Sequence, residues 1–338
     1  MERCNHFWLV ISLLCCTLTG CHRERDYFPR DLEPVSVPII RFDSALLSVR
    51  PDSITQDVRR LYADYEEFMP LFVEGVLGIS STDTAYLCAE LPRFLTDTAM
   101  GFMQTNRLSQ ERFADISRLQ TELSQGFTRM HYLYPALPVP TVYLFVSGFN
   151  SSVFYYDDIM GVGIDMYLGS DYPYYNQVVY DYQKQTMRPE CIPADVLSMF
   201  IAQNTPYTSR YNRLLENIIY RGKQMWLLSQ LLPDEPQYEI IGYTPAQWDW
   251  CITYERAIWN RMMDKRDLFK TESSVLTSYL NDGPFTAEIS QDSPGRLGTW
   301  VGWRIVDSYM RHNEDVTIQQ LMSEPDAQLI LENSYYKP

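Results

Sequence analysis

The chain has 338 residues, of which 46% are apolar and 21% are charged. These values are typical of a folded globular protein and exclude global disorder. Lysine and arginine number 28 against 43 aspartates and glutamates, so the formal net charge is −15, which disfavours a nucleic-acid partner. Aromatic residues reach 14%, which indicates an aromatic-rich core or, as the alternative, an aromatic-lined groove.

The first segment, residues 1–20, predicts a lipoprotein signal peptide. An apolar run follows Arg3 and is shorter than the roughly 20 residues that span a bilayer. The run ends in Leu18-Thr19-Gly20-Cys21, the pattern that precedes the lipidated cysteine of bacterial lipoproteins. We therefore expect cleavage before Cys21 and acyl chains, such as palmitate, that anchor it to the membrane. The alternative is an ordinary secretory signal.

A polar stretch with several prolines predicts a lipidated tether over residues 21–40. Residue 22 is histidine rather than aspartate, which by the usual lipoprotein sorting rule favours the outer membrane over the inner one. The sequence leaves the membrane face open, periplasmic or surface. Residues 41–338 show no internal repeat and no low-complexity segment, and we interpret them as a single globular domain.

Apolar residues at helical spacing predict the first helices of this domain. One helix is expected over residues 54–72, and two short helices over 83–103, divided at Pro92. A third is expected to start near Ser109 as N-cap and to continue to residue 130. The pattern then changes, and β-branched and aromatic residues predict strands at 141–146, 152–156 and 163–168.

Helical patterns resume in the second half of the domain. Helices are predicted at 194–203, at 211–231, after the capping box that Thr244 opens, at 274–280 and at 294–310. The sum predicts an α+β fold, helix-dominated with one small central β-sheet.

Three cysteines remain once the signal is removed and Cys21 is acylated: Cys88, Cys191 and Cys251. Their odd number and wide spacing indicate neither a disulfide framework nor a zinc knuckle. Three buried free thiols are the favoured interpretation. One disulfide with one free thiol is the alternative.

The sequence lacks the common catalytic motifs. No His-Glu-x-x-His, P-loop or Gly-x-Ser-x-Gly occurs, and we expect no metal and no cofactor. Among the carboxylates of Asp157, Asp158, Asp165 and Glu190, two could pair as acid and base, but solvated loop charges are the favoured interpretation.

The helix predicted over residues 294–310 has Arg296 in its first turn and carries Trp300 and Trp303 beyond it. Glycines at 295, 298 and 302 permit close approach of another backbone, so tight helix packing is the favoured interpretation. The alternative is the wall of a binding groove, with Arg296 as a charged anchor and the two tryptophans as aromatic platforms.

Several blocks in a fixed order resemble one family. They are residues 143–150, 163–169, 187–190, 219–223, 242–244, 250–251, 294–303 and 334–338. Together with the lipoprotein signal they resemble the gliding-motility-associated lipoprotein GldB of the Bacteroidota, over essentially the whole mature chain. The resemblance implies a role tied to surface gliding, although the family also occurs in non-gliding relatives.

A fainter resemblance is to gluzincin-type zinc peptidases, in the order of a long helix, a small sheet and two further helices. The helix that carries the zinc motif in those enzymes corresponds to residues 193–204, which contain no histidine. The position of the third ligand is occupied by Arg221, which precedes Gly222. The resemblance implies a zincin-like fold without a metal site, because a cation at residue 221 opposes zinc.

These observations favour a non-enzymatic envelope lipoprotein that contacts other envelope proteins, in a gliding-motility or related envelope machinery. One alternative is a divergent or remnant hydrolase that uses carboxylates such as Asp165 and Glu190 in a zincin-like cleft. Another is a glycan-binding lipoprotein with aromatic side chains exposed on one face. Candidate binding residues are Arg296, Trp300, Trp303, Asp165 and Glu190.

Overall fold

The computed structural model describes residues 25–98 and 101–338, so the predicted signal peptide and Cys21 lie outside the described residues. The chain divides into Met1–Asp31 and a compact unit, Leu32–Pro338. Within the compact unit, the backbone N–H of Val35 donates to Thr128 Oγ1 at 2.9 Å. Gln120 Nε2 donates to the carbonyl of Val37 at 2.8 Å. The tether predicted over residues 21–40 therefore overlaps the folded unit.

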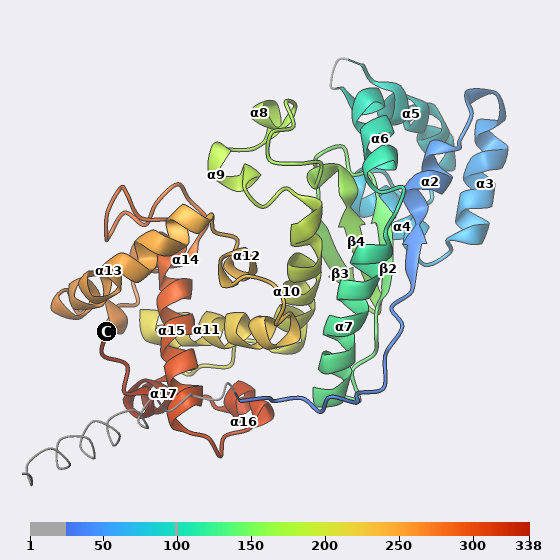
Figure 1. Ribbon diagram of the computed structural model, residues 1–338. Coiled ribbons are helices and arrows are strands. Elements are labelled where there is room, and N and C mark those ends of the chain that lie inside the picture. Colours follow the sequence, from blue (N-terminus) through green and yellow to red (C-terminus); the bar gives the residue numbers. More distant parts are fainter. Residues whose placement is uncertain (1–24, 99–100) are drawn as a thin grey trace, which may run out of the picture. The chain divides into compact units, whose positions relative to one another are not determined.

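The described residues contain one four-stranded sheet in the order β1-β2-β4-β3. The strands are β1 (Ile39–Arg41), β2 (Thr141–Phe145), β3 (Val153–Tyr156) and β4 (Ile159–Gly163). Strands β1 and β4 both run parallel to β2, whereas β3 is antiparallel to β4. The α+β fold, helix-dominated with one small sheet, is thus confirmed (Figure 1).

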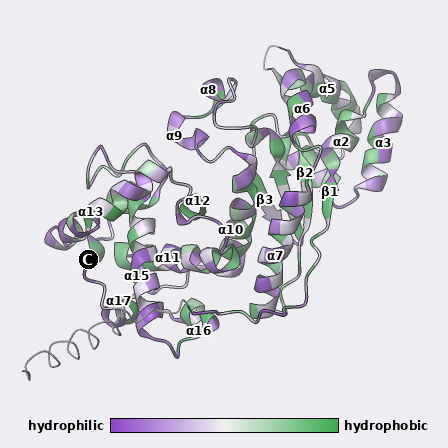
Figure 2. Cartoon of the chain, viewed as in Figure 1, coloured by the Kyte–Doolittle hydropathy of each residue, from purple (hydrophilic) through white to green (hydrophobic). Residues whose placement is uncertain are grey.

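The strands at 141–146 and 152–156 are confirmed, but the one predicted at 163–168 is wrong. Strand β4 precedes it, and Ile164–Met166 form a 3-10 turn (η3). Strand β4 contains Gly161 and Gly163 and is buried throughout, so it shows no alternation of polar and apolar residues. Figure 2 colours the chain by hydropathy; β4 lies between β2 and β3, which are labelled there. Strand β1 was missed because it has too few residues to set a pattern.

Helices precede β2 and separate it from β1. They are α2 (Phe42–Leu47), η1 (Pro51–Ser53, 3-10), α3 (Ile54–Asp64), α4 (Phe68–Leu71), η2 (Phe72–Val76, π), α5 (Thr84–Thr96), α6 (Phe102–Arg112) and α7 (Ser117–Leu133). The single helix predicted over 54–72 is wrong: α3 ends before Tyr65, whose backbone leaves the helical region. Pro70 has no N–H to bond within such a helix, but it fits in the first turn of α4.

The predicted break at Pro92 is also wrong. Helix α5 runs through Pro92 because Leu87, Leu91 and Leu95 keep one face buried on both sides of it. The predicted N-cap at Ser109 lies inside α6 instead, and α7 starts at Ser117. Asp115 initiates α7, since its Oδ1 accepts the backbone N–H of Ser117 at 2.9 Å.

Helices dominate the chain after β4. They are α8 (Tyr175–Val178), α9 (Asp181–Lys184), η4 (Pro189–Cys191, 3-10), α10 (Ile192–Asn204), α11 (Leu214–Leu231), α12 (Gln237–Ile241), α13 (Pro245–Asp264), η5 (Asp267–Phe269, 3-10), α14 (Ser273–Leu280), α15 (Leu297–His312), α16 (Ile318–Ser323) and α17 (Ala327–Ser334). The capping box at Thr244 is confirmed, because its side chain accepts the N–H of Gln247 at 3.2 Å.

Aromatic side chains pack both faces of the sheet. On one face the ring of Phe68 stacks on Tyr143 at 4.3 Å and lies 6.1 Å from Phe154. On the other face Phe200 of α10 meets the edge of Tyr155 at 5.6 Å and Phe127 of α7 at 5.1 Å. The aromatic-rich core expected from the composition is therefore present at the sheet.

Helices α11 and α15 approach each other closely through glycines. A Cβ atom on Gly222 would lie 2.2 Å from the carbonyl carbon of Gly302, and one on Gly302 would lie 1.8 Å from the carbonyl oxygen of Ile218. Neither distance leaves room for a side chain. The tight helix packing predicted from the glycines of residues 295–302 is confirmed.

Candidate functional site

A polar cavity of about 370 Å³ lies among α10, α12 and the start of α15. Figure 1 labels these three helices. Its wall is formed by residues of the segments 166–167, 182–187, 191–198, 239–247, 282–283 and 295–296, together with Ser152, Val179 and Met225. Cavities of this size accept small organic molecules. We refer to it as the Asp195 cavity, after its central acidic residue.

Asp195 lies in the first turn of α10, is half-buried as a residue and lines the cavity. Its Oδ2 accepts the hydroxyl proton of Tyr167 at 2.7 Å. Burial raises the pKa of Asp195 to about 6, partly offset by the Tyr167 hydrogen bond and the charge of Arg296. Burial and the Asp195 charge also raise the pKa of Tyr167 well above its usual value. The carboxyl group of Asp195 therefore keeps its proton to a higher pH than an ordinary aspartate.

Arg296 is the N-cap residue of α15 and has a left-handed φ of 55°. Its Nε lies 2.8 Å from Asp282 Oδ1, and its Nη2 donates to the carbonyl of Ile241 at 2.5 Å. A non-glycine residue adopts this backbone conformation only where surrounding contacts hold it. Arg296 thereby joins α12, the loop after α14 and the start of α15 into one wall.

Further polar contacts fix the opposite part of the cavity. The carboxylate of Glu239 lies 2.5 Å from Arg188 Nη2, and Gln185 Nε2 donates to the carbonyl of Gly242 at 2.9 Å. The hydroxyl of Tyr243 donates to the carbonyl of Gly295 at 2.7 Å. The walls are therefore held by contacts between segments far apart in the sequence, and the cavity is preformed.

Asp165, one of the predicted candidates, lies outside the Asp195 cavity and is fully buried. Its carboxylate accepts the N–H of Ser147 at 2.7 Å, the N–H of Phe149 at 2.8 Å and the hydroxyl of Ser147 at 3.1 Å. Gly148 and Phe149 both have left-handed φ angles, and this turn points the N–H groups of Ser147 and Phe149 at the carboxylate. Asp165 thus holds the loop that follows β2.

The other predicted residues are dispersed. Glu190 is exposed and does not line the cavity, so the structure does not bring it together with Asp165. Trp300 and Trp303 are buried, and their rings pack on Trp248 at 6.3 and 5.7 Å. Arg296 is the one predicted candidate among the described residues that line the cavity.

Sequence reasoning missed Asp195, Tyr167, Glu239 and Asp282. No motif marks them, because their partners are distant in the sequence. A usable signal was present in the family blocks: residues 163–169, 187–190, 242–244 and 294–303 all contribute to the cavity wall.

The structure also places the three cysteines and Arg221, the residue at the position of the third zinc ligand in the gluzincin comparison. Cys88, Cys191 and Cys251 are free thiols in the structure, and Cys191 and Cys251 are buried, whereas Cys88 is only half-buried. Burial raises the pKa of Cys191 to about 12, so it is a poor nucleophile. Arg221 donates to the carbonyl of Leu280, and burial lowers its pKa.

Across residues 25–98 and 101–338, no group of three His, Cys, Asp or Glu side chains could hold a metal ion. In the same described residues, no helix has both the length and the apolar character required to cross a membrane.

Replacing Asp195 by asparagine is expected to stabilise the protein at pH 8 by roughly 1–2 kcal/mol. The raised pKa of Asp195 means that its ionised form destabilises the folded state, whereas the protonated form does not. The contribution of the Asp195 carboxyl group to the free energy of unfolding of the wild-type protein is therefore greatest below pH 4. This contribution is lost as the pH rises toward 6. Asparagine keeps an oxygen that accepts from Tyr167.

Thermal unfolding at pH 8 and pH 4 tests this expectation. The Asp195→Asn variant should melt about 2–3 °C higher at pH 8 and show no shift at pH 4. Glu190→Gln removes an exposed carboxylate and is the control, for which no shift is expected at either pH. A lower melting temperature of Asp195→Asn at pH 8 would contradict a destabilising charge at this position.

The comparisons with known proteins place the chain in a family. The family described as gliding motility protein GldB matches residues 28–338, so the chain belongs to that family. Its members are gliding-motility lipoproteins of the cell envelope. The family is not a known enzyme family. No curated protein and no solved structure matches the chain.

Proposed function

We propose that this protein is a lipid-anchored, non-catalytic component of a gliding-motility or related envelope machinery, and that it acts through contacts with other envelope proteins. The family match over residues 28–338 is the observation that carries the proposal. The sequence Leu18-Thr19-Gly20-Cys21 supports lipidation at Cys21. His22 after the cysteine supports the outer membrane as the destination.

The surroundings of the candidate carboxylates support a non-catalytic role over the hydrolase alternative. Asp165 is saturated by three hydrogen bonds within one loop, and Glu190 is exposed on the surface. Such positions suit a structural carboxylate and a solvated one. The buried positions of Trp300 and Trp303 likewise give no support to a glycan-binding face made of these rings.

Replacing Cys21 by alanine is expected to release the protein from the membrane, because a signal without its cysteine receives no acyl chains. Fractionation of cells should find the wild-type chain with the envelope membranes and the Cys21→Ala variant largely depleted from them. Equal membrane recovery of both forms would contradict lipid anchoring at this residue.

The contact role is tested by affinity capture of the intact lipoprotein from native membranes after mild crosslinking. We expect stoichiometric recovery of a defined set of envelope proteins, and loss of that set with Cys21→Ala. Recovery of abundant membrane proteins alone would oppose a role in a defined assembly and would favour a function of the Asp195 cavity by itself.

A further inference from the structure

A second cavity of about 370 Å³ lies between α11 and the connection from α16 to α17. The loop after α10 closes one side of it. Three aromatic rings and several apolar side chains line this cavity: Tyr134, Tyr207, Tyr220, Pro206, Ile219, Met322, Pro325 and Ala327. We call it the Lys223 cavity, after the buried cation in its wall. It shares no lining residue with the Asp195 cavity.

Lys223 is the distinctive feature of this cavity, because its side chain is only 7% exposed. Its Nζ donates to the backbone carbonyl of Glu324. Within the described residues its Nζ forms no ion pair with a carboxylate, so two further N–H donors have no charged acceptor. A buried ammonium that forms no ion pair is costly, and such a group in the wall of a cavity is a candidate for ligand binding.

Two acidic residues, Glu216 and Glu324, also line the wall. Glu216 Oε1 lies 2.9 Å from Arg213 Nε, and Glu216 Oε2 accepts the backbone N–H of Arg213 at 3.1 Å, so its charge is compensated from outside the cavity. The carboxylate of Glu324 forms no ion pair with Lys223 and accepts the backbone N–H of Asp326 at 2.9 Å. Lys223 is the one cationic side chain among the described residues that line it.

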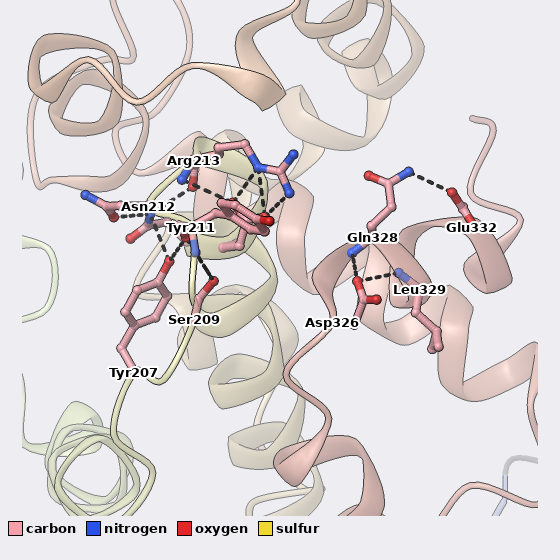
Figure 3. A network of polar contacts seen from close by, with 11 residues as sticks. Tyr207, Ser209, Tyr211, Asn212, Arg213, Asp326, Gln328, Leu329 and Glu332 are labelled. Atoms are coloured by element: carbon pink, nitrogen blue, oxygen red, sulfur yellow. Dashed lines mark hydrogen bonds and ion pairs between the residues drawn. The ribbon is translucent and has the colours of Figure 1, made fainter.

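The rim of the cavity is ordered by its own polar contacts, which Figure 3 shows. The hydroxyls of Tyr207 and Ser209 donate to the carbonyl of Tyr211 at 3.0 and 2.8 Å. On the other side of the view, Asp326 Oδ1 accepts the N–H of Gln328 at 2.9 Å and of Leu329 at 3.1 Å. The start of α17 is thus capped internally and offers these donors to no ligand.

We propose that the Lys223 cavity binds an organic monocarboxylate, with the carboxylate on Lys223 Nζ and the apolar body of the ligand against Tyr134, Tyr207 and Tyr220. A single ammonium matches one negative charge. A phosphate dianion generally requires additional cations or free helix-terminal N–H groups, and the α17 terminus is occupied by Asp326. The aromatic and apolar lining suits a hydrocarbon or aromatic body.

The titration of Lys223 agrees with this assignment. Burial lowers its pKa to about 8, with a small opposing effect from the charge of Glu324. The amine remains mostly protonated at pH 7 and carries the charge that a carboxylate requires. A bound carboxylate would offset the burial and raise the pKa of Lys223 again.

The test uses the full-length lipoprotein in detergent micelles, titrated at pH 7 with hexanoate and with its neutral counterpart hexanamide. Two N-acetylated tripeptides ending in phenylalanine, one a free acid and one an amide, form the second arm. Lys223→Met removes the charge and keeps the length of the side chain. Lys337→Met removes an exposed lysine and is the matched control.

We expect an acid to bind saturably and at least tenfold more tightly than its amide. Binding should weaken at least tenfold in Lys223→Met and stay within twofold of wild type in Lys337→Met. Saturating acid should also protect Lys223, and not Lys337, from acetylation by acetic anhydride, as read by mass spectrometry. Tighter binding of hexanoate assigns the site to free carboxylic acids, and tighter binding of the peptide acid assigns it to a carboxyl terminus.

Two results would overturn the proposal. One is the absence of saturable binding by both acids, and the other is binding that persists in Lys223→Met. Because the cavity, its ligands and its variants are separate from Cys21 and from envelope contacts, either result leaves the proposed function unaffected. Failure of the membrane and capture experiments would in turn leave this assignment standing.

Discussion

Replacing Gly302 by alanine should destabilise the protein by roughly 3–5 kcal/mol, the range of severe steric changes in a packed core. The added Cβ would lie 1.8 Å from the carbonyl oxygen of Ile218, which is closer than any real contact. The obstructing atom belongs to the backbone of α11, so no side chain can move aside. Helices α11 and α15 would have to separate, with loss of contact between buried residues on both.

Thermal unfolding followed by circular dichroism measures this effect, and a fall of about 5–8 °C is expected for a chain of this size. Gly75→Ala is the matched control, since Gly75 is exposed and a Cβ there would meet nothing within 4 Å. The control should change stability by less than about 1 kcal/mol. A Gly302→Ala variant as stable as the control would show that the helices can separate without cost.

Replacing Asp165 by alanine should have the second large effect, also roughly 3–5 kcal/mol. The N–H groups of Ser147, which is buried, and of Phe149, which is half-buried, would lose their acceptor. The carbonyl of Asp165 also accepts the hydroxyl of Tyr175 at 2.8 Å, so a shift of this segment would disturb neighbouring Tyr167 and the Asp195 cavity.

The variant series Asp165→Ala, Asp165→Asn and Asp249→Ala distinguishes structural from chemical roles by melting temperature. The side-chain oxygen of asparagine can accept one of the two N–H groups, but its NH₂ group then faces the other one. We therefore expect the melting temperature of Asp165→Asn to lie between those of the wild type and Asp165→Ala. Asp249 is exposed on α13, and its replacement should change stability by less than about 0.5 kcal/mol. An Asp165→Ala variant with a wild-type melting temperature would reject the structural role and revive this carboxylate as a chemical group.

Local patterns predicted a substantial part of the fold. The capping box of Thr244 and Gln247 links residues three apart, and strand β2 follows from a run of β-branched and aromatic residues. The glycines before and within α15 predicted close packing, which α11 supplies. The helix boundaries near Pro70 and Pro92 were mispredicted, because a proline can lie in a first turn or be tolerated where a buried face is continuous.

The candidate site was predicted poorly, and the reason is the separation of its parts in the sequence. Tyr167 reaches Asp195 across 28 positions, and Arg296 reaches the carbonyl of Ile241 across 55. Asp165 and Glu190 were chosen as carboxylates in distinctive blocks, yet one is buried beneath a loop and the other is exposed. Nothing local distinguishes such carboxylates, since burial and partners come from distant segments.

The sequence by itself determined the fold class and the family, because helical spacing, strand composition and short motifs are properties of neighbouring residues. It also carries the motif Leu18-Thr19-Gly20-Cys21, from which we predict lipidation at Cys21. Only the tertiary structure decided which ionisable groups are desolvated. Asp195 and Lys223 have pKa values of about 6 and about 8 because chain segments that are remote in the sequence remove water from around them.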